Sequence, residues 1–89
     1  MIKEHDRIVL TEPVPAQGLA NGDVGTVVHV YDDGKAFEVE FTTLGGKTAA
    51  VATVKALAVR PVTGREMTHS RELRRSAATS PEPAVAANG

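Results

Sequence analysis

The chain contains no cysteine, which excludes disulfide bonds and thiolate metal ligands. Disulfides are the usual reinforcement of small secreted domains, so their absence favours a reducing cytoplasm. Long apolar runs are also missing, whereas a membrane-spanning helix needs about 20 mostly apolar residues. The opening MIKEHDRIVL has only three consecutive apolar residues, and a secretory signal needs a longer apolar core. We therefore expect a soluble, cytoplasmic protein that does not enter a membrane.

The chain also lacks a strong excess of charge of either sign, since its net charge is −1 over 89 residues. Residues 1–62 carry six Lys and Arg against eight Asp and Glu, and residues 63–89 carry four against three. The body is mildly acidic and the tail mildly basic. No global basic field is present that would concentrate phosphate groups at the surface.

A serine nucleophile is absent from the body, because the only serines are Ser70, Ser76 and Ser80. Nucleophilic catalysis needs a nucleophile, a base and an orienting group that converge in one pocket. A chain of 89 residues is at most one small domain, with little room for such a pocket. We expect no enzymatic activity and no cofactor.

Metal-ligating residues are few and scattered. The three histidines lie far apart along the chain: His5, His29 and His69. No pair has the i, i+4 spacing that places two imidazoles on one face of a helix to bind zinc. Asp23, Asp32 and Asp33 lack the regular spacing of a calcium loop, and aspartate at such positions favours turns. We expect no metal site.

Short alternating runs predict five strands, at residues 5–11, 24–31, 36–41, 49–54 and 59–62. In the third run, AFEVEF, Phe37, Val39 and Phe41 share one face. Glu38 and Glu40 share the other face, as in a half-buried antiparallel strand. The second run, VGTVVHVY, has apolar residues on both faces, which predicts a strand that is covered on both sides or strongly bent.

Glycines are expected to shape the turns and bends between these strands: Gly22, Gly25, Gly34, Gly45 and Gly46. A phosphate cradle would need a glycine loop that leads into a helix, with Lys or Arg nearby. Gly25 instead leads into a strand and has acidic neighbours. Pro13 and Pro15 make residues 12–22 a long loop, and KALA, residues 55–58, predicts one helical or 3₁₀ turn.

Together these features predict a mainly β fold, a small SH3-like barrel of five bent antiparallel strands over residues 1–62. Residues 63–78 form an arm. Thr63 and Glu66 have the spacing of a helix capping box, but the arm has only a weak apolar stripe, so a helix and disorder both remain open. Residues 79–89, rich in proline and alanine, are expected to be disordered.

Four segments of the chain resemble a small bacterial family catalogued as domain of unknown function 4926: residues 6–10 (DRIVL), 22–28 (GDVGTVV), 31–41 (YDDGKAFEVEF) and 59–61 (VRP). The resemblance implies an SH3-like fold and brings no active site with it. Members often neighbour small genes suspected of encoding toxins. The resemblance therefore implies an antitoxin or immunity role toward the product of a neighbouring gene.

A second, shorter likeness points elsewhere. GLANGDVGTVVHV is similar to the KOW motif of ribosomal and transcription-elongation proteins, whose domains bind RNA or protein. The alternative function is therefore that of a KOW-like, RNA-associated accessory domain. Elongation-type members are basic around the motif, whereas Asp23, Asp32 and Asp33 surround the glycines here.

We expect a non-catalytic module that binds a protein, for example by taking up a partner strand at an open sheet edge. The residues expected at the contact are Tyr31, Asp32, Asp33, Glu38, Glu40, Met67 and Leu73. Nucleic acid is disfavoured, because stacking platforms need several exposed aromatic rings beside a basic groove and only Tyr31 fits. The chain is expected to be a monomer or a weak homodimer that forms through an open edge.

Overall fold

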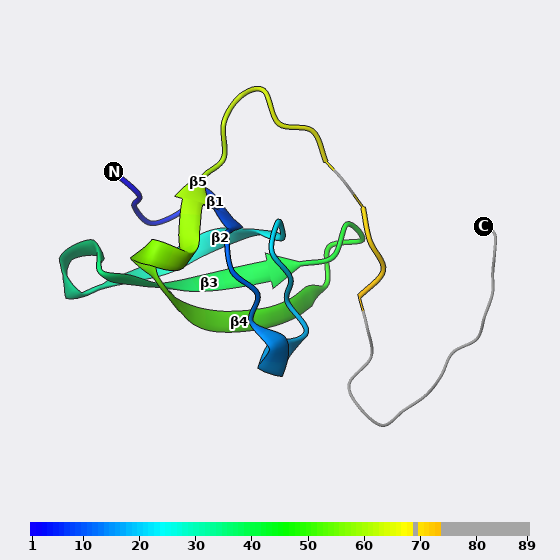
Figure 1. The fold of residues 1–89 in the computed structure, drawn as a ribbon, viewed down its shortest axis with the longest axis horizontal. Coiled ribbons are helices and arrows are strands. Elements are labelled where there is room, and N and C mark those ends of the chain that lie inside the picture. Colours follow the sequence, from blue (N-terminus) through cyan, green and yellow to red (C-terminus); the bar gives the residue numbers. More distant parts are fainter. Residues whose placement is uncertain (69, 74–89) are drawn as a thin grey trace.

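The computed structural model describes residues 1–68 and 70–73 (Figure 1). Its strands are β1 (Arg7–Leu10), β2 (Val24–Tyr31), β3 (Ala36–Thr42), β4 (Thr48–Lys55) and β5 (Val59–Pro61). Three 3₁₀ turns lie between them, η1 (Pro15–Gln17), η2 (Asp32–Gly34) and η3 (Ala56–Ala58). The strands form one antiparallel sheet in the order β4-β3-β2-β1-β5. The prediction of a mainly β fold with five bent antiparallel strands is confirmed.

The long strand β2 bends because it belongs to both halves of the sheet. Its residues from Val24 to Thr26 pair with β1, and those from Thr26 to Tyr31 pair with β3. Opposite β3, Val27 pairs with Val39 and His29 pairs with Glu38, so Val28 is an extra residue. Such a β-bulge increases the local twist and bends the strand. The bend explains why the sequence of β2 shows apolar residues on both faces.

The core lies inside the bent sheet and is wholly apolar. It contains Ile8, Leu10, Leu19, Val27, Phe37, Val39, Phe41, Ala52, Val54 and Val59. The alternation predicted for β3 is confirmed, since its two phenylalanines and Val39 are buried while Glu38 and Glu40 lie on the outer face. Leu19 comes from the β1–β2 loop, and no pattern in the sequence predicted that it would lie in the core. Among the described residues, no polar or charged side chain is buried.

The turn between β2 and β3 adopts a left-handed backbone over three consecutive residues. Asp32, Asp33 and Gly34 have φ angles of 50°, 56° and 95°. The sequence predicted this conformation at Gly34 alone, but aspartate tolerates it because its short side chain can hydrogen-bond locally. Gly45 has no such backbone angle, and Gly25 lies inside β2 rather than in a turn. The role of Gly25 is therefore to allow close packing, not to form a turn.

The arm contains no helix in its described part, residues 63–68 and 70–73. Half of the expected capping box forms, because the Thr63 amide donates to the Glu66 carboxylate at 2.7 Å. The chain then continues without helical structure. Residues 69 and 74–78 of the arm, and the tail at 79–89, lie outside the described residues. Over the range that the structure covers, no helix is long and apolar enough to cross a membrane.

Candidate functional site

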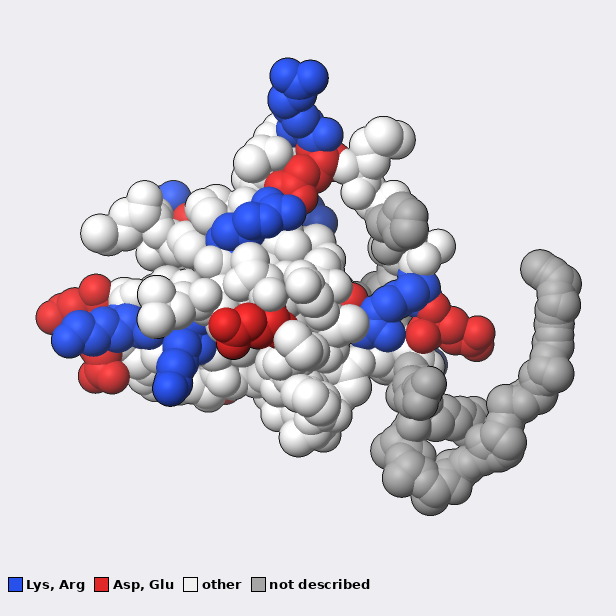
Figure 2. All heavy atoms as spheres, in the orientation of Figure 1, with Lys and Arg blue, Asp and Glu red and all other residues white. Residues whose placement is uncertain are grey.

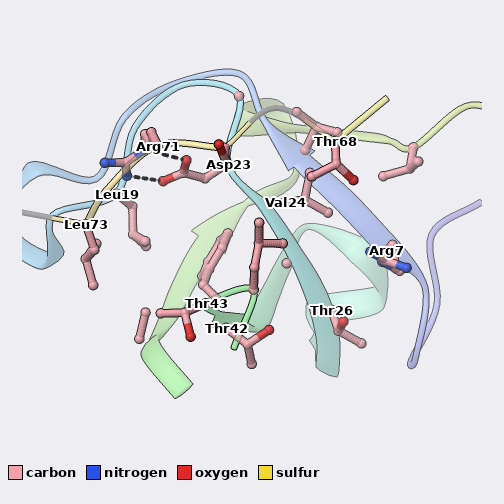
Figure 3. A pocket seen from close by; sticks show the side chains of 18 of the residues that line it. Arg7, Leu19, Asp23, Val24, Thr26, Thr42, Thr43, Thr68, Arg71 and Leu73 are labelled. Atoms are coloured by element: carbon pink, nitrogen blue, oxygen red, sulfur yellow. Dashed lines mark hydrogen bonds and ion pairs between the residues drawn. The ribbon is translucent and has the colours of Figure 1, made fainter. Parts of the chain in front are cut away.

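A groove of about 1000 Å³ lies between the arm and the barrel (Figure 3). Val9, Val24 and Phe41 line it on the side of the barrel. Met67 and Leu73 line it on the side of the arm. Charged side chains from both sides also reach it. The groove therefore combines an apolar floor with charged groups at its margins.

Val9 shows how the barrel contributes to this floor. Its side chain is only 4 % exposed, yet it packs outside the contiguous core that contains its neighbours Ile8 and Leu10. Within the sheet, Val9 pairs with Val24 on one side and with Arg60 on the other. Successive residues of a strand point to opposite faces, so Val9 points out of the barrel and toward the groove. The apolar run IVL thus supplies both the core and the groove.

One end of the arm is fixed by Arg71. Its Nε donates to Asp23 Oδ1 at 2.9 Å, and its Nη2 donates to Asp23 Oδ2 at 2.5 Å and to the Gly18 carbonyl at 3.1 Å (Figure 3). Asp23 also accepts a hydrogen bond from the Ala20 amide at 2.8 Å. This contact, which we call the Arg71 clamp, ties the arm to the β1–β2 loop.

The Arg71 clamp keeps the Asp23 carboxyl ionised. Partial burial of Asp23 raises its pKa, but the hydrogen bonds from Arg71 and the Ala20 amide outweigh this effect, and the pKa lies below its ordinary value. The sequence predicted a turn role for Asp23 and a mildly basic tail, which contains Arg71. It did not predict that the two residues meet, because they are 48 positions apart and no local pattern connects them.

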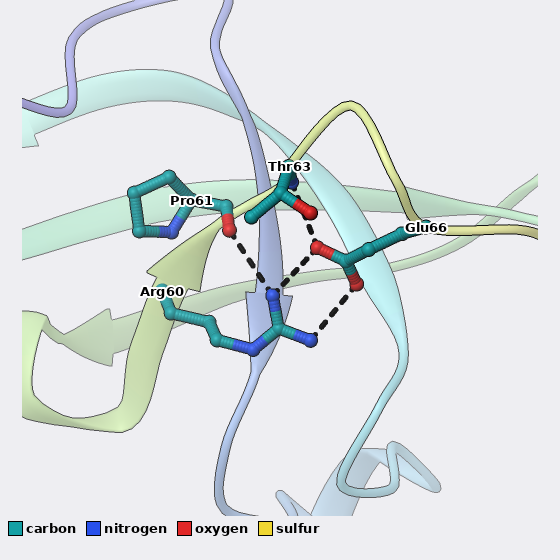
Figure 4. Close-up of polar contacts among 4 residues, drawn as sticks. All are labelled: Arg60, Pro61, Thr63 and Glu66. Carbon is teal, nitrogen blue, oxygen red and sulfur yellow. Dashed lines mark hydrogen bonds and ion pairs between the residues drawn. The ribbon is translucent and has the colours of Figure 1, made fainter.

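The start of the arm is fixed by Arg60 on β5 (Figure 4). The Arg60 guanidinium donates to both oxygens of Glu66, at 2.7 and 2.9 Å, and to the Pro61 carbonyl at 3.2 Å. The Glu66 carboxylate also accepts the Thr63 amide. We call this contact the Arg60 clamp. The hydrogen bonds from Arg60 and then from Thr63 lower the pKa of Glu66 to about 2.

The Arg60 clamp is expected to survive mild acid. Because the pKa of Glu66 is lowered in the folded state, the clamp is fully present above the ordinary value of 4.5 and is lost as the pH falls through about 2. NMR titration of the Glu66 side-chain carboxyl carbon should give a midpoint near 2. A Glu66 midpoint near 4.5 would show that the clamp does not form.

The expected contact residues divide into two groups. Tyr31, Asp32, Asp33 and Glu38 lie together at the β2–β3 turn, and we call them the acidic patch. The Tyr31 hydroxyl donates to Glu38 at 2.6 Å, which raises the pKa of Tyr31. Figure 2 shows carboxylates at this end of the molecule, on the left of the view, with basic side chains beside them. The tyrosine ring also packs edge-on against His29, with ring centroids 4.5 Å apart.

The other three expected residues, Glu40, Met67 and Leu73, lie at the groove. Glu40 accepts a hydrogen bond from the Thr48 hydroxyl at 2.6 Å. Met67 is 90 % exposed, so its side chain is not used by the packing of the barrel. Sequence reasoning placed Glu38 and Glu40 on one outward face, which is confirmed by the structure. It did not predict that Glu38 bonds to Tyr31 whereas Glu40 lines the groove.

Within residues 1–68 and 70–73, no three His, Asp or Glu side chains converge as a metal site would require. Ser70 lines the groove, whereas Ser76 and Ser80 lie outside the described residues. The two arginines of the clamps already pair with carboxylates. What the groove offers is an apolar floor with charged and hydrogen-bonding groups around it.

A family model described as "Domain of unknown function (DUF4926)" matches residues 4–61. The matched span contains all five strands and ends where the arm begins. No curated protein and no solved structure matches the chain.

Proposed function

We propose, since the chain belongs to the DUF4926 family, that its barrel is a non-catalytic module that binds another protein. The observation that carries the proposal is the groove, which stays open although the arm above it is tied at both clamps. A partner segment that enters this groove would contact the barrel floor and the arm together.

The way the arm is attached supports this proposal. Both clamps are ion pairs at or near the surface, where solvent and salt screen the attraction, so neither pair holds the arm strongly. Met67 and Leu73, the apolar side chains of the arm, add nothing to the contiguous core. The arm can therefore shift to admit a partner at low cost, and its apolar side chains are available to cover that partner.

The acidic patch indicates the chemistry of the partner. Asp32 and Asp33 are exposed at the tip of the β2–β3 turn, and Glu38 continues the acidic surface along β3. Complementary charge mainly increases association rates and selects between partners. The proposed partner presents basic side chains to the acidic patch and an apolar segment to the groove.

The narrower form of the proposal is that the chain is an antitoxin-type or immunity-type partner of a neighbouring gene product. The RNA-associated alternative is less well supported, because Arg60 and Arg71 at the groove each form a bidentate pair with a carboxylate. A phosphate would have to displace Glu66 or Asp23 before it could bind them.

Co-expression of the tagged full chain with the neighbouring gene product should yield a complex on purification, and toxicity of that product, if any, should be relieved. In calorimetric titration, M67D should weaken binding at least tenfold, because it places a carboxylate in the apolar part of the groove. L57D is the matched control, since Leu57 is 89 % exposed but lies in η3, outside the groove.

D32N/D33N should slow association with the partner and reduce the salt dependence of the association rate, because it removes two charges from the acidic patch. The turn should keep its shape in this variant, because asparagine also tolerates the left-handed backbone.

Three results would contradict the proposal: no complex with no relief of toxicity, equal effects of M67D and L57D, or no effect of either variant. Polarisation titration with bulk RNA at low salt is expected to show no binding. Binding that weakens steeply with salt would favour the RNA-associated alternative instead.

A further inference from the structure

The two edges of the sheet differ in how well they are protected. The β5 edge is three residues long and contains Pro61, which lacks a backbone donor, and the charged Arg60. The β4 edge is eight residues long, has no proline, and is uncharged from Thr48 to Val54. Natural proteins usually protect an exposed edge with charge, proline or a short strand. A β-bulge is another such device, and β4 has one near its start, where its pairing with β3 shifts from Ala50 to Thr48; its single charge, Lys55, lies at its other end.

The far side of β4 is open within the described part of the chain. β3 is its only strand partner there, and no other described segment exchanges backbone hydrogen bonds with residues 48–55. Ala52 and Val54 are buried in the core and hold the strand in place, while Val51 on the outer face is 44 % exposed. Every second backbone amide and carbonyl of an edge strand points away from its sheet. The β4 edge is therefore a rigid template for one more strand.

We propose that this strand is β4 of a second copy of the chain, added antiparallel about a two-fold axis at Ala52, so that the sheet continues across the dimer. A two-fold axis makes both copies use the same surface and closes the assembly at two chains. The alternative of β4 pairing with β5 of another copy is disfavoured, because β5 is short and carries Pro61.

The sequence of β4 selects this register. Directly opposed residues of antiparallel strands lie on the same face of the sheet, so the axis must pass through a residue rather than between two residues. An axis at Val51 would oppose Lys55 to Lys47 of the second copy, two like charges. An axis at Ala52 opposes Val51 to Thr53 and Ala50 to Val54, all within the part of β4 that pairs regularly with β3, and it places Lys55 beside the uncharged Ala49 at the bulge.

The charges on the neighbouring strand are compatible with this dimer. Glu38 and Glu40 of β3 lie one strand away from the edge, opposite Thr53 and Val51 of β4. The β3 strands of the two copies would be three strand spacings apart, about 14 Å. That distance exceeds the screening length of roughly 8 Å at physiological salt, so the glutamates repel weakly.

The second copy would also extend the groove. Its Lys55 lies opposite Ala49, which lines the groove, and on the same face as Glu40. A lysine side chain can reach from Ala49 toward the Glu40 carboxylate across β4. The dimer thus places a basic group of one copy at the groove of the other, which adds an attractive pair to the interface.

Sedimentation equilibrium of the full chain over rising concentration should show a shift from monomer to dimer. V51K and T53E should each weaken dimerisation at least tenfold, because each places two like charges diagonally across the axis. Mixing V51K with T53E should restore association to within about threefold of the unmodified chain, since the introduced lysine then faces the introduced glutamate. V28K is the matched control, because Val28 is 41 % exposed at the bulge of β2, away from this edge.

Circular dichroism of each variant checks that the barrel remains folded, and all three sites are exposed on the surface. A chain that stays monomeric up to about 1 mM overturns the proposal. So does a dimer that V51K and V28K weaken equally, because the interface would then lie elsewhere. If V51K and T53E each weaken dimerisation but their mixture does not associate again, the Ala52 register is ruled out. The dimer described above is then ruled out as well.

Discussion

Replacing Gly25 with valine is expected to unfold the barrel or leave it only partly folded. Gly25 is buried inside β2, with the side chains of Val39 and Phe41 directly above it. A Cβ atom at this position would lie 2.5 Å from Val39 Cγ1 and 2.8 Å from two ring atoms of Phe41. Neither neighbour can move aside easily, because both are fixed in the core by the packing around them.

The expected loss follows from how little stability a chain of this size has. Overpacking a core costs typically 1–3 kcal/mol, and valine at Gly25 adds three carbon atoms to a site with no room for one. We expect a loss of about 3 kcal/mol or more, against a total near 5 kcal/mol for so small a domain. Urea unfolding followed by circular dichroism measures the difference.

Gly64→Val is the matched control, because no atom lies within 4 Å of the position where its Cβ would be built. Its effect should stay within about 0.5 kcal/mol. Removing the Val39 side chain that a Cβ at position 25 would meet should also relieve the clash. The double variant G25A/V39A should therefore lose less free energy of unfolding than the sum of the losses in G25A and V39A. A G25V chain that keeps its full stability and loses only partner binding would instead make Gly25 part of a ligand site.

Replacing Asp23 with alanine is expected to destabilise the barrel and release the arm at the same time. The Asp23 carboxylate holds the Ala20 amide and both donors of Arg71. A hydrogen bond to a charged group contributes about 1.5–3 kcal/mol, and most of the Asp23 side chain is shielded from solvent. We expect the free energy of unfolding to fall by about 2 kcal/mol. The heteronuclear NOE of Glu72 and Leu73 should fall in the same variant, because the arm loses its anchor.

Arg71→Ala separates these two effects. It should lower the heteronuclear NOE of Glu72 and Leu73 as much as Asp23→Ala does. Because it leaves the Asp23–Ala20 hydrogen bond intact, it should lower the free energy of unfolding by no more than about 1 kcal/mol. Equal losses of stability in both variants would mean that the β1–β2 loop depends on Arg71. An unchanged arm in both variants would mean that the Arg71 clamp does not order it.

The sequence was informative wherever neighbouring residues determine the structure. Alternation in AFEVEF predicted both faces of β3. The apolar residues on both faces of β2 predicted a strand that is either covered on both sides or bent, and the bulge at Val28 accounts for a bend. The 3₁₀ turn at residues 56–58 also follows from a local signal. Leu19 shows the limit of this reasoning, because a leucine in a glycine-rich loop has no periodicity that would indicate burial.

The site was predicted only in part, for the same reason. Tyr31 and Glu38 are diagonal neighbours in the β2–β3 hairpin, because Tyr31 pairs with Ala36 and His29 pairs with Glu38, so the acidic patch could be found from the sequence. The groove depends on the path of the arm, which Arg60 and Arg71 determine through contacts with Glu66 and Asp23. The Thr63-to-Glu66 spacing favoured a helix cap, but the Glu66 carboxylate also pairs with Arg60. The local sequence pattern around Glu66 does not indicate this ion pair.

The strand order β4-β3-β2-β1-β5 has a consequence for how the chain folds. β2, β3 and β4 follow one another through short turns, so each can pair soon after its neighbour forms. β1 pairs with β5 through residues such as Val9 and Arg60, and about fifty residues must close into a loop before that contact exists. During synthesis we therefore expect the three-stranded meander to form first. β1 acquires its second neighbour only when the end of the barrel has left the ribosome.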